Sequence, residues 1–500
     1  MILLYLSLLL GGSAIAWQIV KRPFLGLLLM LAVNPLEDLF TLPAGLSAGR
    51  LVGTMVVIGW VVYLGRSSKA GKLLRQGRLI KIVWAFPILC IIGVMASQLG
   101  TAESVGGGYS AAISISLLAI MALMIENLVD NKQRMNQLML VVVLSSTVAA
   151  IFPLAYFLGV DIYSPLGIDA TATVESGRAL GLTNNPNGLG LATSMGLFAL
   201  IIYISAQRRL RDALLFSFIA LVMIGGLILS GSRTHLIAFM ACIIVFGFLR
   251  VRGPKKVRLP TAAGALALLA LLILAFWKAP EDLQERFILV GDQVHESTLR
   301  REAFVGLQRQ HALELLSEHP LLGVGLKNFQ YPLDYDAHDT ISMLMGETGL
   351  FGTLSALWLV ASVGVWLYRG IKTGKRQRDL ALYNYSTGLM ASLVAMLIAG
   401  LGGYVMFYQR WFWITAGMSA VMARWAGQEE LVSALGTSRR EPGAFIGEAP
   451  MMPRGVHFMG GSLSDPSVRP SQHKSKFAAL PRAQGRAGPL DGHGGGDRGE

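Results

Sequence analysis

The chain has 500 residues, of which 53% are hydrophobic and only 15% are charged, and this composition excludes an ordinary soluble domain. The net charge of +13 does not indicate a nucleic-acid-binding protein, because the basic residues cluster in short loops between apolar segments, as they do in membrane proteins. Apolar segments long enough to cross a bilayer recur as far as residue 425. The sequence therefore predicts an all-α, polytopic membrane protein without a nucleic-acid partner.

The apolar segments give the predicted order of the helices. Along the chain, the expected spans are residues 1–20, 23–40, 50–65, 82–99, 111–129, 138–159, 187–205, 213–230, 234–250, 259–277, 341–367, 381–404 and 411–426. These make about thirteen transmembrane helices, or about twelve if the short second segment does not cross. The first segment lacks a basic start, so we expect it to be retained as a helix and not cleaved as a signal peptide.

The loop charges predict an orientation. Alternate loops are basic, such as 66–81 and 369–378, and the loops between them hold more acidic residues; the positive-inside rule places the basic loops in the cytoplasm. We predict a transmembrane helical domain over 1–427 that contains a large periplasmic loop at 278–340. The Gly- and Pro-rich cytoplasmic tail at 428–500 is expected to be disordered, because it has too little apolar surface to bury.

The large periplasmic loop is too long to be a simple connection. Within it, Phe304, Leu307, His311 and Leu315 recur at helical spacing. This spacing predicts an amphipathic helix over 299–318 that lies along the membrane surface.

Two arginines border predicted spans on the outward side, where an ionisable group indicates function because it is costly to hold there. Arg233 lies in the tight turn LSGSRTH and could offer several donors to a diphosphate, or it could reach lipid headgroups. Arg178 precedes the turn-rich stretch GLTNNPNGLGLA. There, Asn185 or Asn187 can cap the next helix and leave its N–H groups to an anion, or the stretch is an ordinary capped turn.

A second polar stretch lies at the start of the eleventh span. His338 can accept a proton at neutral pH, although a lone histidine is more often a structural hydrogen-bonding group. Asp339 or Thr340 can cap the first turn of the span. Glu347 lies deeper and on roughly the opposite side of a regular helix from His338, so we expect it to form a hydrogen bond to a neighbouring helix.

Other chemistries have weaker signals. Glu37 and Asp38 are an adjacent acidic pair in the first outward loop, which would suit a divalent cation in a metal-dependent glycosyltransferase. The two cysteines, Cys90 and Cys242, both lie in apolar segments, so a disulfide framework is not expected. The sequence has no Walker loop, His-Glu-x-x-His or Gly-x-Ser-x-Gly motif, so nucleotide-driven and zinc-hydrolase activities have no support.

Four blocks, taken in order, resemble the O-antigen ligase and O-antigen polymerase family of bacterial membrane enzymes, which handle lipid-linked glycans. They are RALGLTNNPNGLGLA at 178–192, LSGSRTHLIAF at 229–239, EHPLLGVGLKNF at 318–329 and AHDTISMLMGETGLFG at 337–352. The long outward loop is a further trait of the family. The resemblance covers roughly residues 130–400.

The resemblance implies a glycosyltransferase-C-like fold in the bacterial inner membrane and a saccharide donor carried on undecaprenyl diphosphate. It implies transfer outside the cytoplasmic membrane, with inversion and without metal, nucleotide or other cofactor. The acceptor would be a lipid A core, another repeat chain or a protein, in the biosynthesis of lipopolysaccharide, capsule or exopolysaccharide.

By motif, the resemblance implies that Arg178, Arg233 and Arg301 bind the donor diphosphate and that His338 is the catalytic base. Arg300 or Arg309 could replace Arg301, because the spacing to the next block is about one helical turn longer than the family pattern.

Three further residues are expected to support the site: Asn187, Asp339 and Glu347. Asp339 stands where the family pattern has asparagine. Two other functions remain open, the metal-dependent polyprenyl-phosphate glycosyltransferase and a transporter of polysaccharide or lipid-linked sugar. A transporter predicts paired half-repeats with broken helices, and the sequence has no such pairing.

Overall fold

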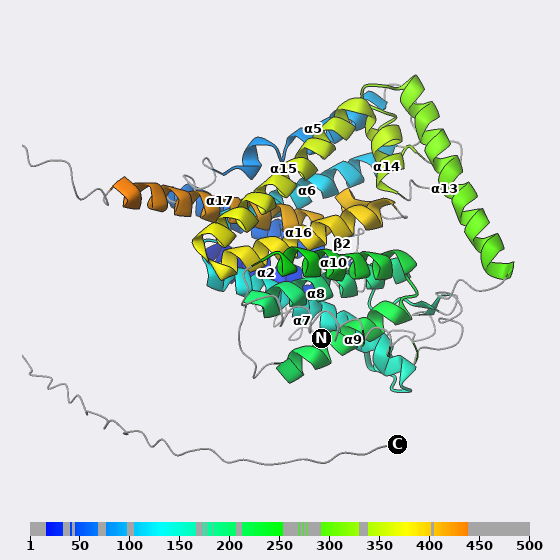
Figure 1. The fold of residues 1–500 in the computed structure, drawn as a ribbon. Helices are drawn as coiled ribbons and strands as arrows, with labels where there is room; N and C mark the ends of the chain where they lie inside the picture. The colour runs from blue at the N-terminus through cyan, green and yellow to red at the C-terminus, as the bar shows by residue number, and fades with distance from the viewer. Residues whose placement is uncertain are drawn as a thin grey trace, which may run out of the picture. The chain divides into compact units, whose positions relative to one another are not determined.

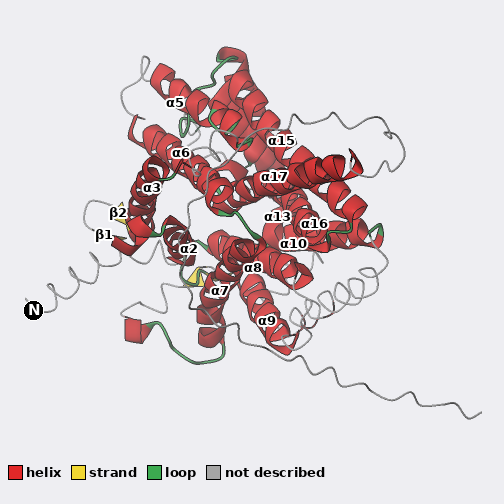
Figure 2. Ribbon diagram, turned by 90° about the vertical axis from the view of Figure 1, so that its left-hand side faces the viewer, coloured by secondary structure: helices red, strands yellow, loops and turns green. Residues whose placement is uncertain are grey.

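The computed structural model divides the chain into two units, Met1–Arg440 and Glu441–Glu500, and every residue described below lies in the first. The described residues are 17–33, 41–42, 46–68, 77–97, 105–166, 174–175, 178–183, 185–206, 213–253, 270, 274, 277, 292–329, 339–401 and 405–438. Nearly all of them are helical (Figures 1 and 2).

The main helices follow the predicted apolar segments. They are α2 (Pro23–Val33), α3 (Ala48–Arg66), α5 (Ala85–Ser97), α6 (Val105–Leu128), α7 (Lys132–Phe157), α8 (Pro186–Ala206), α9 (Ala213–Leu229), α10 (Arg233–Val251), α13 (Asp292–Glu318), α14 (Thr340–Ser342), α15 (Thr348–Gln377), α16 (Leu380–Leu401) and α17 (Arg410–Ser438). Short elements join them: the 3-10 helices η3 (Leu79–Lys81), η4 (Ser164–Leu166) and η8 (Met406–Tyr408), the π-helix η7 (Met343–Glu347), and the two-residue strands β1 (Thr41–Leu42), β2 (Leu46–Ser47), β3 (Val174–Glu175) and β4 (Arg178–Ala179). The strands form two antiparallel hairpins, β1–β2 and β3–β4.

Seven described helical segments are long and apolar enough to cross a membrane. They are Leu79–Ser97, Gly107–Leu128, Lys132–Phe157, Pro186–Ser205, Arg233–Val251, Thr340–Gln377 and Leu380–Leu401, and shorter apolar helices lie at Pro23–Val33, Val52–Arg66 and Leu215–Leu229. This architecture confirms the prediction of an all-α polytopic membrane protein. The expected spans 1–20 and 259–277 lie largely outside the described residues. The expected span 411–426 lies inside α17, which also continues past residue 428, where the tail was predicted to begin.

Helix α16 runs antiparallel to α10. Near the start of α16, the Tyr383 hydroxyl donates to the Leu249 carbonyl at the end of α10, at 2.8 Å. Further along, Cys242 of α10 lies beside Ser392 of α16. The residue numbers fall on α10 as they rise on α16, so the start of α10 lies beside the end of α16.

Helix α8 has the same relation to α16. The Asn384 side chain donates to the Ser205 carbonyl, at 2.5 Å, and Gly388 contacts Ile202. The first turns of α8 and α10 and the last turn of α16 therefore meet at one end of the helices, which the predicted orientation makes the outward end. In both views, α5 and α6 lie on one side of α16 and α8 and α9 on the other (Figures 1 and 2).

The start of α14 joins this outward end. A side chain on Gly400 would place its Cβ 2.8 Å from the Thr340 hydroxyl, and the same hydroxyl accepts a hydrogen bond from the Met406 amide of η8, at 3.0 Å. The segment that follows His338 is thereby fixed against the ends of α16 and η8.

The glycine-rich turn after α13 packs directly on the π-helix. The Val324 amide donates to the Gly346 carbonyl and the Gly325 amide to the Glu347 carbonyl, both at 3.0 Å. Gly349 then breaks the helix with φ 60° and ψ −163°. The expected span 341–367 lies within the helical segment Thr340–Gln377, which is irregular near its start because the amides of the preceding loop donate to the carbonyls of Gly346 and Glu347.

The predicted amphipathic helix is α13, which begins at Asp292 and ends at Glu318. Among the described side chains of α13, Gln308, Ala312 and Leu315 are buried, whereas Leu307 is 57% exposed. Helix α13 packs on the π-helix and α14 through the buried line, and its position along the membrane surface stays a prediction.

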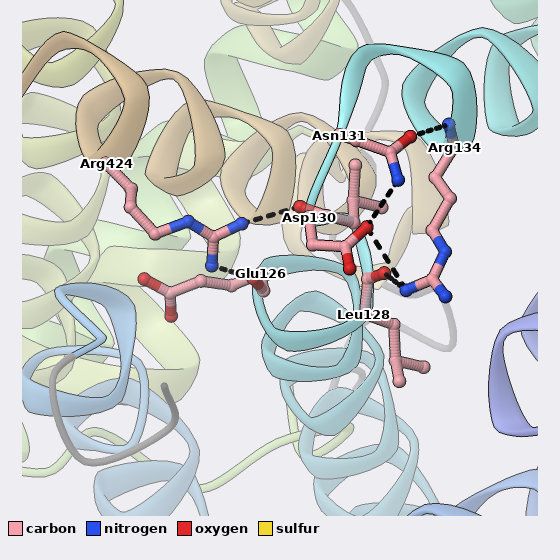
Figure 3. Close-up of polar contacts among 7 residues, drawn as sticks. Glu126, Leu128, Asp130, Asn131, Arg134 and Arg424 are labelled. Carbon is pink, nitrogen blue, oxygen red and sulfur yellow. Dashed lines mark hydrogen bonds and ion pairs between the residues drawn. The ribbon is translucent and has the colours of Figure 1, made fainter. Parts of the chain in front are cut away.

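Two arginines bind the last carbonyls of α6 at the opposite, inner end (Figure 3). Arg424 of α17 donates to the carbonyls of Glu126 and Val129, both at 2.6 Å. Arg134 of α7 donates to the carbonyl of Leu128, at 2.7 Å. Cationic donors satisfy the carbonyl groups that a helix leaves unpaired at its C-terminus, so α17 and α7 are both joined to the end of α6.

Replacing Arg424 with methionine is expected to lower the free energy of unfolding by about 3 kcal/mol, because it removes two charge-assisted hydrogen bonds to buried carbonyls while the aliphatic stem remains. Thermal unfolding in detergent measures the effect. Arg134→Met is the matched control. Its guanidinium lies at the surface, so its loss is expected to cost under about 1 kcal/mol. Equal losses for the two variants would contradict this account of α6.

Candidate functional site

Arg178 connects three elements at the outward end. It lies on β4, in the hairpin that precedes α8. Its Nε donates to the Ser230 carbonyl in the turn between α9 and α10, at 2.9 Å, and its Nη2 donates to the Asn187 Oδ1 of α8, at 2.8 Å. A planar guanidinium can make both contacts at once, and a lysine ammonium on a flexible stem cannot reproduce that fork. Arg178 therefore holds the start of α8 against the turn before α10.

The two asparagines before α8 have different roles. Asn185 is the cap, because its Oδ1 accepts a hydrogen bond from the Asn187 amide, at 2.8 Å, and Pro186 opens the helix with a φ suited to that position. The sequence left Asn185 and Asn187 as alternatives for this role. Asn187 instead uses its side chain to position Arg178.

Gly190 lets α8 approach the turn before α10. A Cβ at this position would lie 2.8 Å from Ser232 Cβ, 3.0 Å from Ser230 Oγ and 3.2 Å from His235 Nδ1. The first of these distances is shorter than any ordinary contact between carbon atoms. Glycine is therefore the residue that allows the start of α8 to lie against the LSGSRTH turn.

Arg233 is the first residue of α10 and is half-buried. The turn that presents it is held by its own hydroxyl groups: the Ser230 Oγ donates to the Leu227 carbonyl at 2.6 Å, and the Ser232 Oγ lies 2.7 Å from the buried His235 Nδ1. These contacts fix the backbone on both sides of Arg233, so the two predicted arginines Arg178 and Arg233 are brought to the same turn.

Asp339 is the N-cap of α14. It is 1% exposed, and its Oδ1 accepts hydrogen bonds from the amides of Ile341 and Ser342, at 2.9 and 3.0 Å. Its Oδ2 accepts from the Ser342 hydroxyl, at 2.7 Å. Of the two predicted caps, the chain uses Asp339, and Thr340 binds η8. An aspartate serves this role as well as an asparagine.

Several predicted site residues lie outside the described part of the chain. These are His338, Glu37 and Asp38, together with the side chains of Arg300 and Arg301, whose backbones lie in α13. Of the three loop arginines considered from the sequence, Arg309 has a described side chain. Its Nη2 donates to the Leu401 carbonyl at the end of α16, at 3.4 Å. Arg309 therefore lies at the same outward end as Thr340.

Glu347 lies at the end of the π-helix. It is 2% exposed and accepts a hydrogen bond on Oε2 from the Tyr408 hydroxyl, at 3.3 Å. This partner belongs to η8, a short helix between α16 and α17. The prediction that His338 and Glu347 lie on opposite sides holds for a regular helix. The wider turn of the π-helix changes the direction in which Glu347 points.

Sequence reasoning missed His235 and Tyr408. His235 lies inside the LSGSRTH block two residues after Arg233, and the signal was its place in that turn. Tyr408 follows a break between two apolar helices, and its contact with Glu347 depends on tertiary structure alone. Within the described residues, no group of three or more His, Cys, Asp or Glu side chains is placed to hold a metal ion.

The arrangement suits an anionic ligand. Helices α8 and α10 both begin at this end, and a helix N-terminus carries partial positive charge and N–H groups without intrahelical partners. Arg178 and Arg233 add guanidinium groups, which match phosphate oxygens in shape and charge.

The comparison with known families agrees with the sequence motifs. Residues 218–357 match the family model described as O-Antigen ligase, a range that includes Arg233, Arg301, His338, Asp339 and Glu347. No curated protein matches the chain. The family match confirms the predicted resemblance, and it falls in a multi-pass membrane protein. Residues 218–357 therefore belong to the O-antigen ligase family, whose name describes a glycan-transferring enzyme.

Proposed function

We propose that this protein transfers a saccharide from an undecaprenyl-diphosphate carrier to an acceptor glycan at the outer face of a bacterial inner membrane. The reaction would serve the biosynthesis of a cell-surface polysaccharide such as O-antigen, capsule or exopolysaccharide. The observation that carries the proposal is the position of Arg178. It is hydrogen-bonded to both Asn187 and the Ser230 carbonyl at the end where α8, α10 and α14 begin.

The proposed step has simple bond changes. An acceptor hydroxyl attacks the anomeric carbon of the donor sugar, a new C–O glycosidic bond forms, and the bond from that carbon to the phosphate oxygen breaks. The bonding electrons leave with the diphosphate, and the hydroxyl proton passes to His338. Attack from the face opposite the leaving group inverts the anomeric centre.

The protein has two tasks in this step. Arg178 and Arg233 stabilise the charge that develops on the departing diphosphate, and the N-termini of α8 and α10 act in the same direction. His338 accepts the proton, and the burial and hydrogen bonds of Asp339 fix the chain immediately after it. Orientation of two large substrates supplies the rest of the rate acceleration. The proposal needs no metal or nucleotide, because the diphosphate is already a good leaving group.

Arg178→Ala and Arg233→Ala are each expected to lower the rate of carrier release by about 10- to 100-fold, because each removes a charged donor to the departing diphosphate. The assay uses vesicles of the purified protein with an undecaprenyl-diphosphate oligosaccharide, EDTA, and both a lipid A core and a repeat-chain acceptor. Release of undecaprenyl diphosphate is followed over time. The glycosylated product separates a ligase, which uses the lipid A core, from a polymerase, which uses the repeat chain.

Arg252→Ala is the matched control, since Arg252 lies at the inner end of α10, 4.0 Å above the Phe248 ring, and is expected to leave the rate unchanged. Two results would contradict the proposal. Carrier release that requires a divalent cation would favour the metal-dependent reaction with Glu37 and Asp38. Movement of sugar across the membrane without carrier release would identify a transporter.

A further inference from the structure

We propose that Lys327 and Tyr408 form the binding subsite for the acceptor glycan and that Glu347 and Asn328 hold this subsite in place. The inference rests on the proposed function. A reaction that joins two large substrates needs two binding places, one on each side of the group that takes the proton. The arginines provide the place for the diphosphate, and a second polar cluster lies among different helices of the same outward end.

The second cluster is built around the Tyr408 ring. The Lys327 Nζ lies 5.6 Å from the centroid of this ring, a distance at which a cation is attracted to the aromatic face. The Tyr408 hydroxyl donates to the buried Glu347 carboxylate, at 3.3 Å. Lys327 and Tyr408 are both half-buried, so they combine a fixed position with a surface that a ligand can reach.

The backbone at Lys327 is strained. Its φ is 64°, and among the described residues the other non-glycine residue with a positive φ is Arg378, with φ 59°. A side chain disfavours this region, and such strain persists where the surroundings impose it, commonly at functional sites. Here the N-terminal end of α6 lies close to the turn: a Cβ on Gly108 would lie 2.8 Å from the Leu326 carbonyl, and a Cβ on Gly107 would lie 3.6 Å from Lys327 Cβ.

Asn328 anchors the same turn. Its Nδ2 donates to the Ser97 hydroxyl at the end of α5, at 3.1 Å, and to the Val324 carbonyl, at 2.8 Å. The next residue, Phe329, is fully buried. The Lys327 backbone is thus held between α5, α6 and the π-helix, and its ammonium group is presented over Tyr408 in one arrangement.

The two clusters flank the segment that follows His338. Tyr408 and Met406 both lie in η8, and the Met406 amide binds the Thr340 hydroxyl. Arg178 and Arg233 lie at the same outward end, beside the first turns of α8 and α10, and these helices pack on α16. The second cluster is lined by α5 and α6, on the opposite side of α16 (Figure 1).

The chemistry of the two clusters differs in the way this division requires. Two guanidinium groups and the N-termini of α8 and α10 suit the several negative charges of a diphosphate. One ammonium group beside an aromatic ring suits a sugar, because the ammonium donates to hydroxyl groups while the ring face packs on the C–H groups of a pyranose. The second cluster therefore fits a hydroxyl-rich glycan.

The experiment compares Lys327→Gly with Arg378→Gly in the vesicle assay, using the lipid A core and repeat-chain oligosaccharides separately as acceptors. Both variants remove a cation and relieve a positive φ, which glycine adopts without strain, but Arg378 lies at the inner end of α15. Lys327→Gly is expected to raise the KM for the acceptor glycan by about 5- to 10-fold, because one hydrogen bond from a charged ammonium group is lost. The KM for the saccharide donor should stay unchanged. Its unfolding temperature should not fall.

Arg378→Gly is expected to change neither KM, and Lys327→Arg is expected to keep the acceptor KM within about twofold, because it preserves the cation over the ring. An unchanged acceptor KM in Lys327→Gly would overturn the subsite, and so would an equal rise in both KM values. In either case the wild-type protein still transfers saccharide. If the wild type releases no carrier with any acceptor, the proposed function fails first, so the two failures are distinguishable.

Discussion

Replacing His338 with alanine is expected to lower the rate of saccharide transfer by about 10²- to 10⁴-fold, which is the usual contribution of a general base. The acceptor hydroxyl is a weak nucleophile until its proton is removed, and alanine offers no group to take it. The KM for the donor should stay unchanged, because in this proposal the arginines bind the diphosphate. Single-turnover transfer in vesicles at saturating donor and acceptor measures the effect.

His319→Ala is the matched control. His319 is exposed, and its backbone amide donates to the Leu315 carbonyl at the end of α13, a contact that alanine retains. This variant is expected to transfer saccharide at the wild-type rate. If His338→Ala kept the rate within about threefold of wild type, a loss too small for a general base, another group would have to accept the proton.

Gly349→Ala is expected to destabilise the protein by about 4 kcal/mol or more, with loss of folded material from the membrane. Its φ of 60° and ψ of −163° lie in a region that is essentially limited to glycine. A Cβ there would also lie 2.8 Å from both the carbonyl carbon and the carbonyl oxygen of Leu321. The clash would push the start of α15 away from residues 320–321. These segments are joined by hydrogen bonds from the Leu350 amide to the Pro320 carbonyl, at 2.9 Å, and from the Phe351 amide to the Leu321 carbonyl, at 3.1 Å.

Gly364→Ala, in the same helix, provides the comparison. Its Cβ would meet one atom, the Leu393 Cδ2 at 3.9 Å, which is an ordinary contact. Alanine in a regular helix is favoured over glycine, so this variant is expected to be as stable as wild type or slightly more stable. Thermal unfolding in detergent measures both variants, and equal unfolding temperatures would show that the kink at Gly349 carries no special strain.

The helices were predictable from the sequence because their signal is local. Apolar length alone places α8, α10 and α16 close to their observed bounds, since a bilayer core demands a fixed length of helix. The Asn185 cap followed by Pro186 is also a local signal. The π-helix at Met343–Glu347 has no such signal, because apolar residues there satisfy a hydropathy pattern with any helical period.

The site was partly predictable, for a different reason. Arg178 and Arg233 stood out as cations next to apolar segments, and such groups are costly unless they have a use. Their meeting depends on the contact between Arg178 and Ser230, which lie far apart in the chain. The exposure of Leu307 and the contact between Glu347 and Tyr408 were not predictable for the same reason. Each depends on how one element packs against another, which the local sequence does not show.

Several of the contacts described above end on main-chain carbonyl groups. Arg178 reaches the carbonyl of Ser230, Arg309 that of Leu401, and Arg424 those of Glu126 and Val129. A main-chain acceptor survives any substitution of its own side chain except those that move the backbone. Half of each contact is therefore insensitive to mutation, and the side chains around the frame can diverge to suit other glycans while the frame stays intact. For an engineer who wishes to change the sugar specificity, these arginines are the positions to keep.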